Sequence, residues 1–212
     1  CATLGATLAF TTATVQGAET VNYFGAGGLQ PDTFNSALSS VGPSGIDAVP
    51  DGADSVDNNI VTVNYIPNGT NDITGSVYGA FRWDNTAVYD NRVTLNIGTV
   101  AHSVYGAYSY YGTSSDNIVA LYGGSVGALV FGGYSASAAV TGNQVSLTNA
   151  SIAHSLYGGY SGSGAVNLNQ VVINSGTVDV FVYGGYSSTL TAAQNWVTLY
   201  GGSVGQGVFG GY

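Results

Sequence analysis

The sequence predicts an all-β protein built as a β-solenoid, and three observations support this fold class. Asparagine recurs at a constant spacing of 26 residues, at Asn91, Asn117, Asn143, Asn169 and Asn195. Each of these residues opens a short run in which apolar and polar side chains alternate, which is the period of a β-strand. The chain is also rich in Gly, Val, Thr and Tyr and has no helical periodicity after residue 57, so helices are not expected there.

Residues 57 to 212 hold the repeat, which we count from its asparagine as position zero. Positions two, four, nine and thirteen carry Val, Leu or Ile in every full copy. We predict that these side chains point inward and form the core. A degenerate earlier copy begins at Asn59 and is lengthened by the insertion YIPNGTNDIT, so the region predicts about six coils.

A fixed period of this length indicates one supersecondary unit stacked on copies of itself. A propeller blade needs four strands and about 40 residues, which is longer than one repeat. One solenoid coil, with two or three short strands and glycine at its corners, fits the length. Stacked coils place each residue about 4.8 Å from its counterpart, so we expect the repeated Asn and Gly to be structural, with the asparagines bonding to one another along the stack.

Each repeat also contains an aromatic-Gly-Gly-Tyr motif. Position fourteen is Tyr or Phe, the next two positions are Gly-Gly except for Gly106-Ala107, and position seventeen is always Tyr. Because Gly-Gly can reset the alternation of a strand, the sequence leaves open which aromatic column faces solvent. The constant hydroxyl at position seventeen favours that column as the exposed one, either as a plain stack or as a contact for a sugar or a partner protein. Its members are Tyr108, Tyr134, Tyr160, Tyr186 and, in the last copy, Tyr212.

The first 56 residues lie outside the repeat. Residues 2 to 15 alternate apolar and polar side chains and are predicted to form a β-strand. Its apolar face consists of Ala2, Leu4, Ala6, Leu8 and Phe10. Residues 16 to 56 hold three of the four prolines and no period, so we expect an irregular cap or linker over one end of the solenoid. Within it, Tyr23-Phe24-Gly25-Ala26 weakly echoes the aromatic motif and suggests a degenerate coil.

Composition limits the partners and the attachment of the chain. Two basic and eleven acidic residues give a net charge of -9, which argues against nucleic acid as a partner. No window reaches the roughly 18 uncharged apolar residues of a membrane-spanning helix. The single cysteine is Cys1, which rules out an intrachain disulfide. Two interpretations of Cys1 stay open: a lipid-anchored residue exposed by signal-peptide cleavage, or a chain cropped at this point.

Only one arrangement resembles a catalytic site. Asp90 and Asp116 each precede a repeat asparagine, so we expect them about 5 Å apart on neighbouring coils, the separation of a retaining glycosidase pair, with Arg92 close in sequence. The next coil has Gly142 at this place, and no histidine or aromatic cleft accompanies the pair. A solvated turn is therefore the favoured interpretation, and the sequence predicts no catalytic residues.

No metal or cofactor site is predicted either. His102 and His154 occupy the same repeat position but lie two coils and about 10 Å apart, too far to share a zinc ion. Gly-rich stretches such as LYGGSVG lack the Lys and the helix of a phosphate loop.

The stretches NQVVINSGTVDVFVYGGYS and NIVALYGGSVGALVFGGYS resemble repeats in the passenger regions of bacterial autotransporter-like surface proteins. The resemblance covers residues 57 to 212 and does not extend to the first 56. It implies a secreted β-solenoid displayed at the cell surface, with an adhesive or structural role. It brings no catalytic residues that could be transferred to this sequence.

The last repeat breaks off at Gly210-Gly211-Tyr212, and an uncapped coil leaves unpaired N–H and C=O groups at its strand edges. Either the natural chain continues or a neighbouring subunit fills this edge, with residues 1 to 15 as the candidate donor strand. We therefore expect a non-enzymatic structural protein of the bacterial exterior that assembles head to tail into a filament. The alternatives are a monomeric autotransporter-type adhesin that binds glycans or host or microbial surface proteins, and a polysaccharide-cleaving β-helix enzyme.

Overall fold

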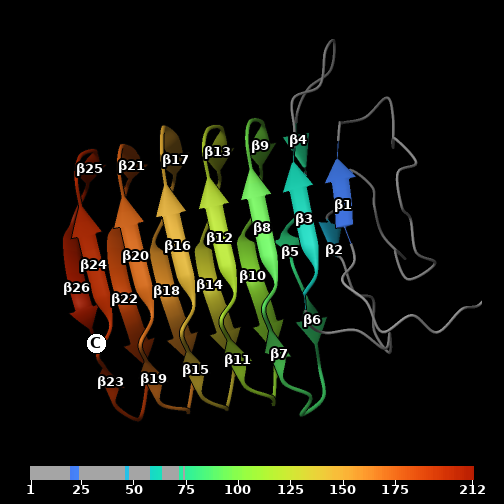
Figure 1. Ribbon diagram of the computed structural model, residues 1–212. Helices are drawn as coiled ribbons and strands as arrows, with labels where there is room; N and C mark the ends of the chain where they lie inside the picture. The colour runs from blue at the N-terminus through green and yellow to red at the C-terminus, as the bar shows by residue number, and fades with distance from the viewer. Residues whose placement is uncertain (1–19, 24–45, 48–57, 64–71, 74) are drawn as a thin grey trace, which may run out of the picture.

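The stacked repeat folds as a β-solenoid with 26 residues in each regular turn. The structure, a computed structural model, describes residues 20–23, 46–47, 58–63, 72–73 and 75–212. Within these ranges all regular secondary structure is β-strand. Each turn follows a front sheet, crosses an upper edge, returns along a back sheet and closes along a lower edge (Figure 1). The predicted fold class is therefore confirmed.

The front sheet has seven strands, and their order in the sheet follows their order along the chain. From β3 onward, each strand begins directly after a repeat asparagine. The strands are β1 (Thr20–Tyr23), β3 (Ile60–Val63), β8 (Arg92–Leu95), β12 (Ile118–Leu121), β16 (Gln144–Leu147), β20 (Gln170–Ile173) and β24 (Trp196–Leu199).

The back sheet has eight strands and carries the aromatic motif. Two of them, β5 and β6, both pair with β10 and together correspond to one strand of the later coils. The strands are β2 (Ile46–Asp47), β5 (Val77–Tyr78), β6 (Phe81–Arg82), β10 (Val104–Ser109), β14 (Val130–Ser135), β18 (Leu156–Ser161), β22 (Phe181–Ser187) and β26 (Gly207–Gly211).

Short strands line the two edges and join the large sheets. The upper edge consists of β4 (Asp72–Ile73), β9 (Thr99–Val100), β13 (Ser125–Val126), β17 (Ala150–Ile152), β21 (Gly176–Val178) and β25 (Ser203–Val204). The lower edge consists of β7 (Val88–Tyr89), β11 (Ser114–Ser115), β15 (Val140–Thr141), β19 (Val166–Asn167) and β23 (Ala192–Ala193).

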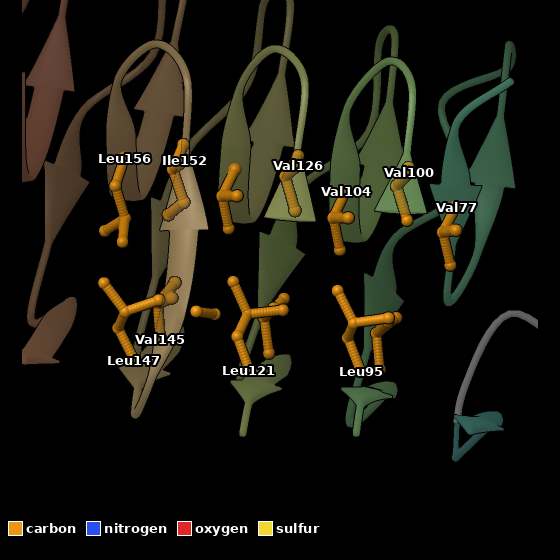
Figure 2. Close-up of a cluster of buried hydrophobic side chains, with 14 of the residues drawn as sticks. Val77, Leu95, Val100, Val104, Leu121, Val126, Val145, Leu147, Ile152 and Leu156 are labelled. Atoms are coloured by element: carbon orange, nitrogen blue, oxygen red, sulfur yellow. The ribbon is translucent and has the colours of Figure 1, made fainter. Parts of the chain in front are cut away.

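The core consists of apolar side chains that repeat from coil to coil. All strand pairs among the described residues are parallel, and in the regular coils each residue pairs with its counterpart one repeat away, as Val119 does with Val145. The side chains at positions two, four, nine and thirteen are buried in one continuous cluster, except in the last coil. Figure 2 shows this recurrence in the row of Leu95, Leu121 and Leu147. The predicted inward positions are therefore confirmed.

A ladder of buried asparagine side chains runs along one side of the core. The Nδ2 of each asparagine donates to the Oδ1 of the asparagine in the next coil, at 2.8 to 3.0 Å. The backbone N–H of the same residue donates to that same oxygen, at 2.9 to 3.1 Å. The second hydrogen on Nδ2 is donated to backbone carbonyls. In Asn143, for example, Nδ2 also donates to the carbonyls of Ser114 and Thr141. The amides therefore join the coils from inside, as the spacing predicts.

Two short strands extend the solenoid at its N-terminal end. β1 pairs with β3, and β2 pairs with β5, both in parallel (Figure 1). They lie within the segment 16–56 that was predicted to be a cap or linker, whose other residues lie outside the described ones. Tyr23 pairs with Val63 in the front sheet, so it does not take the place of the aromatic motif, which is in the back sheet. The predicted strand at residues 2–15 lies outside the described residues.

Replacing Val145 by Asp tests the inward assignment. The valine side chain is fully buried between two coils, so a carboxylate there has no partner, and we expect a loss of about 4 kcal/mol or more in the free energy of unfolding. Gln144→Asp is the matched control, because this neighbouring side chain is exposed on the outer face of β16. Urea unfolding compares the two variants, and equal midpoints would show that the assignment is wrong.

Candidate functional site

Two columns of aromatic side chains lie on the outer face of the back sheet. Position seventeen gives the column predicted to be exposed, and its members from Tyr108 to Tyr186 are half-buried. Position fourteen gives a second column on the same face, in which Phe131 and Tyr183 are buried. Neither column belongs to the core cluster, so both face outward, and the column at position seventeen is the more exposed of the two.

The Gly-Gly pair between the columns brings both onto one face. In a regular strand, residues three apart point to opposite faces of the sheet. Here Tyr105 pairs with Phe131 and Tyr108 pairs with Tyr134, but the register skips Gly106 between them. The strand shifts its phase by one residue at that glycine, as the sequence allowed.

Close neighbours explain why both positions of the pair must be small. A Cβ on Gly132 would collide with the carbonyl oxygen of Gly158 in the next coil. A Cβ on Gly133 would lie 2.5 Å from the Nδ2 of Asn143, which belongs to the ladder. The first position is thus fixed as glycine by the backbone of the neighbouring coil, and the ladder restricts the second to glycine or, as at Ala107, alanine.

The rings of each column stack face to face along the solenoid. Successive ring centroids in a column are 4.6 to 5.2 Å apart, with planes within 17° of parallel. Within one coil the two rings meet edge to face at 5.2 to 5.8 Å. Each such pair contributes about 0.5–1.5 kcal/mol beyond area burial. Because neighbouring rings cover the faces, the columns present only ring edges and hydroxyl groups to solvent.

The two columns together form an aromatic slab, and burial within this slab changes the ionisation of its tyrosines. Loss of solvent raises the pKa of Tyr105 and of Tyr157 to about 12, with a smaller contribution from neighbouring tyrosines. The pKa values of Tyr108 and Tyr134 are raised for the same reason. The slab therefore favours neutral phenols, and it opposes any chemistry that needs a tyrosinate.

A column of buried serines borders the slab, and the sequence analysis did not single it out. The hydroxyl at position eighteen donates to a carbonyl in the preceding coil and accepts the N–H three residues later, as Ser135 does with Gly112 and Ala138. The constant 26-residue spacing of these serines was the signal available in the sequence. The column consists of Ser109, Ser135, Ser161 and Ser187.

The predicted carboxylate pair lies in an exposed turn whose conformation accounts for its residue types. Asp90 and Asp116 adopt left-handed backbone conformations, with φ of 57° and 56°. Gly142 occupies the same place with φ of 71°, and the corresponding residues of the next two coils, Leu168 and Gln194, also have positive φ. Asp, Asn and Gly tolerate this region best, so the turn geometry by itself explains the carboxylates.

The other predicted site residues do not come together in one place. His102 and His154 are exposed. Among residues 58–63, 72–73 and 75–212, no group of three His, Cys, Asp or Glu side chains could hold a metal ion. The described part of the chain also contains no helix with the length and apolar character needed to cross a membrane. Cys1 and the apolar residues Ala2 to Phe10 lie outside the described residues.

The coil of residues 195–212 has an open outer edge. Leu199 is 48% exposed, whereas Ile173, its counterpart one coil earlier, is fully buried. Val208 is 41% exposed, and its counterpart Val182 is fully buried. The predicted assembly residues at this edge are exposed as well, namely Gly210, Gly211 and Tyr212.

Comparisons with protein-family models, with curated proteins and with solved structures give no match for this chain.

The buried tyrosines predict a loss of stability at high pH. An unfolded tyrosine has a pKa of about 10, whereas Tyr105 and Tyr157 have a pKa of about 12 in the fold. The folded state holds these protons more tightly, so their contribution is complete below about pH 10 and is lost between about pH 10 and 12. Urea midpoints measured across this range should fall, and they should fall less steeply in Tyr157→Phe. A midpoint that stays constant up to pH 12 would contradict this prediction.

Exchanging residues in the left-handed turn separates a structural role from a catalytic one. Asp116→Asn should leave the free energy of unfolding within about 0.5 kcal/mol of the parent, because Asn tolerates this conformation equally well. Leu168→Asn should stabilise the protein by about 1 kcal/mol, because a branched side chain is strained there. If the parent cleaves a polysaccharide and Asp116→Asn does not, the turn is catalytic and this interpretation fails.

Proposed function

We propose that this chain is a non-enzymatic structural protein of the bacterial cell exterior whose solenoids stack head to tail into a filament. The observation that carries the proposal is that each inner coil edge is completed by a nearly identical coil, and that residues 195–212 carry the same edge. Side chains such as Leu199 and Val208, whose counterparts form the core of the earlier coils, are exposed there. A row of exposed core residues beside unpaired strand edges is a surface suited to another coil.

A nearly identical coil lies inside the solenoid and is covered. Residues 117–134 are paired on their outer side with the following coil, Val119 with Val145 and Val130 with Leu156. The same surface on residues 195–212 therefore has the side chains needed to accept a further coil. The two coils differ only at Ile118 and Trp196, Ala120 and Thr198, Ala128 and Gln206, and Leu129 and Gly207.

The asparagine ladder supports stacking in one direction. Each ladder residue from Asn91 to Asn169 donates from its N–H and Nδ2 to the next asparagine on the C-terminal side and accepts through Oδ1 from the one on the N-terminal side. The Nδ2 of Asn195 donates to the carbonyl of Val166, which uses one of its two hydrogens. Its other donors face the open edge, where an acceptor would continue the ladder. Two open edges placed against each other would oppose donor to donor, so head-to-tail contact with a second copy is favoured.

The extracellular location in this proposal rests on the resemblance of residues 57–212 to passenger repeats of surface proteins. The surface of the second copy that would meet the open edge is its N-terminal end. This end carries β1 and β2 and lies opposite the open edge in Figure 1. Residues 1–15 with their alternating apolar side chains are proposed to add a strand to the joint.

Val208→Asp tests assembly through the open edge. The fold should tolerate the change, because Val208 is already 41% exposed. The contact between two stacked copies should not tolerate the change, because stacking would bury an unpaired carboxylate. We expect filaments of the parent in negative-stain images, and monomers or short oligomers of the variant. Parent filaments should persist in about 1 M salt, where charges are screened within about 3 Å.

Gln206→Asp is the matched control, since it adds the same charge to an exposed turn of the same coil and should assemble as the parent does. Deleting residues 1–15 should shorten the assemblies while circular dichroism shows an intact solenoid. Filaments of unchanged length from Val208→Asp would rule out this edge as the joint. A parent that stays monomeric at every concentration would overturn the proposed function itself.

A further inference from the structure

A separate cluster of aromatic side chains lies at the corner between the back sheet and the lower edge. Its members are Trp83, which follows β6, and Tyr110 and Tyr111, which follow β10. The ring centroids of Trp83 and Tyr110 are 5.0 Å apart, and those of Tyr110 and Tyr111 are 4.6 Å apart. Trp83 also meets Phe81 edge to face at 5.4 Å, which ties the cluster to the end of the aromatic slab.

The rings of this corner cluster are arranged differently from those of the columns. The planes of Trp83 and Tyr110 meet at 37°, and those of Tyr110 and Tyr111 at 68°. Trp83 is 52% exposed and Tyr111 is 57% exposed. Ring surface that the columns cover by stacking is therefore available to a ligand here.

The repeat is irregular at this corner. Arg82 pairs with Ser109, and Val88 pairs with Ser114. The number of residues from Arg82 to Val88 is one larger than the number from Ser109 to Ser114, so the earlier corner holds one additional residue. In the later coils, small residues take the places of Tyr110 and Tyr111. The surface beside the cluster therefore has no large side chains at these places and is rich in hydroxyl groups. The small residues are Ala136 and Ser137, Gly162 and Ser163, and Ser188 and Thr189.

Polar groups border the rings. Asp84 is exposed, and its Oδ1 accepts the N–H of Thr86 at 3.0 Å. Hydrogen bonds from Thr86, and the charge of Arg82 to a lesser degree, lower the pKa of Asp84, so this carboxylate is ionised at neutral pH. Ser137 is exposed on the other side of the cluster and donates to the carbonyl of Tyr110. The corner thus joins an apolar platform to acceptors and hydroxyl groups.

We propose that Trp83, Tyr110 and Tyr111 form a binding site for a neutral polysaccharide chain. A sugar ring has an apolar face of C–H groups and a rim of hydroxyl groups, which matches an exposed indole and phenol bordered by Asp84 and Ser137. The site extends beyond the structural role proposed above and does not depend on it.

The size and charge of the surface decide against the other classes of partner. One aromatic side chain buries about 150–250 Å², so three partly exposed rings offer on the order of 300 Å². A stable protein interface needs about 800 Å² on each partner, which is well above this area. Asp84 beside the rings and the net charge of -9 oppose acidic polysaccharides and anionic lipid surfaces.

Tryptophan fluorescence can report on this site directly. The chain has two tryptophans, Trp83 and Trp196, so Trp196→Phe leaves Trp83 as the single reporter. The probes are cellohexaose, chitohexaose and mannohexaose, with polygalacturonate as the acidic polymer and phosphatidylcholine vesicles as a membrane surface. We expect a saturable change in Trp83 emission with at least one neutral hexasaccharide, and none with polygalacturonate or vesicles.

Calorimetric titration of the same hexasaccharide then compares variants of the full chain. Trp83→Ala and Tyr111→Ala should each weaken binding about tenfold or more, as the loss of a central aromatic contact does. Tyr122→Ala is the matched control, because Tyr122 is 51% exposed, lies outside the cluster and should bind as the parent does. Circular dichroism checks that each variant is folded.

Three results would overturn the proposal. They are no response to any neutral hexasaccharide, binding that is unchanged in both cluster variants, or a stronger response to polygalacturonate or vesicles than to sugars. Because the readout is sugar binding by single chains, its failure is distinct from a failure of filament assembly.

Discussion

The contact on which the rest of this structure depends is the hydrogen bonding of each ladder asparagine to the next. One side-chain oxygen accepts both the backbone N–H and the Nδ2 of the preceding asparagine, all of them buried. Because both donors must reach the same atom, a slip of one residue between coils would leave buried polar groups without partners. The ladder therefore fixes one register, and with it every other column of like residues.

Packing between the asparagine ladder and the next coil also shapes the aromatic slab outside. A ladder amide such as that of Asn143 leaves room for no more than glycine or, as at Ala107, alanine at the position of Gly133. The adjoining Gly132 is held against the backbone of the next coil. The strand shifts phase at this first position, which is glycine in every coil, so positions fourteen and seventeen both point outward and their rings pack edge to face. Close packing between coils thus places both aromatic columns on the exterior face.

How much the sequence predicts depends on whether a feature repeats with constant residue types. The core valines and the asparagine ladder repeat in this way, and both were predicted. The left-handed residue before each asparagine repeats in conformation but not in type, since it is Asp116, Gly142 and Leu168 in successive coils, so its shared geometry is invisible in sequence. The common face of the aromatic columns depends on a strand shift whose extent only the packing around the glycines decides. The corner cluster could not be predicted from the repeat, because an additional residue after Arg82 puts Trp83 out of step with the count and the later coils have small residues in place of Tyr110 and Tyr111.

The two proposals draw on opposite properties of a repeat. Assembly uses its regularity. A coil edge that pairs with the next coil of the same chain has the donors, acceptors and apolar rows needed to pair with an equal coil from another chain. Ligand binding needs a departure from regularity, because stacked side chains cover one another's contact surfaces wherever the repeat is perfect. At the corner beside Trp83 the next coil has Ala136 and Ser137 in place of Tyr110 and Tyr111, which leaves ring surface exposed beside a carboxylate. The strand pairs on both sides of this irregular corner, β6 with β10 and β7 with β11, hold it in place, so a specific contact can be carried on an otherwise uniform structure.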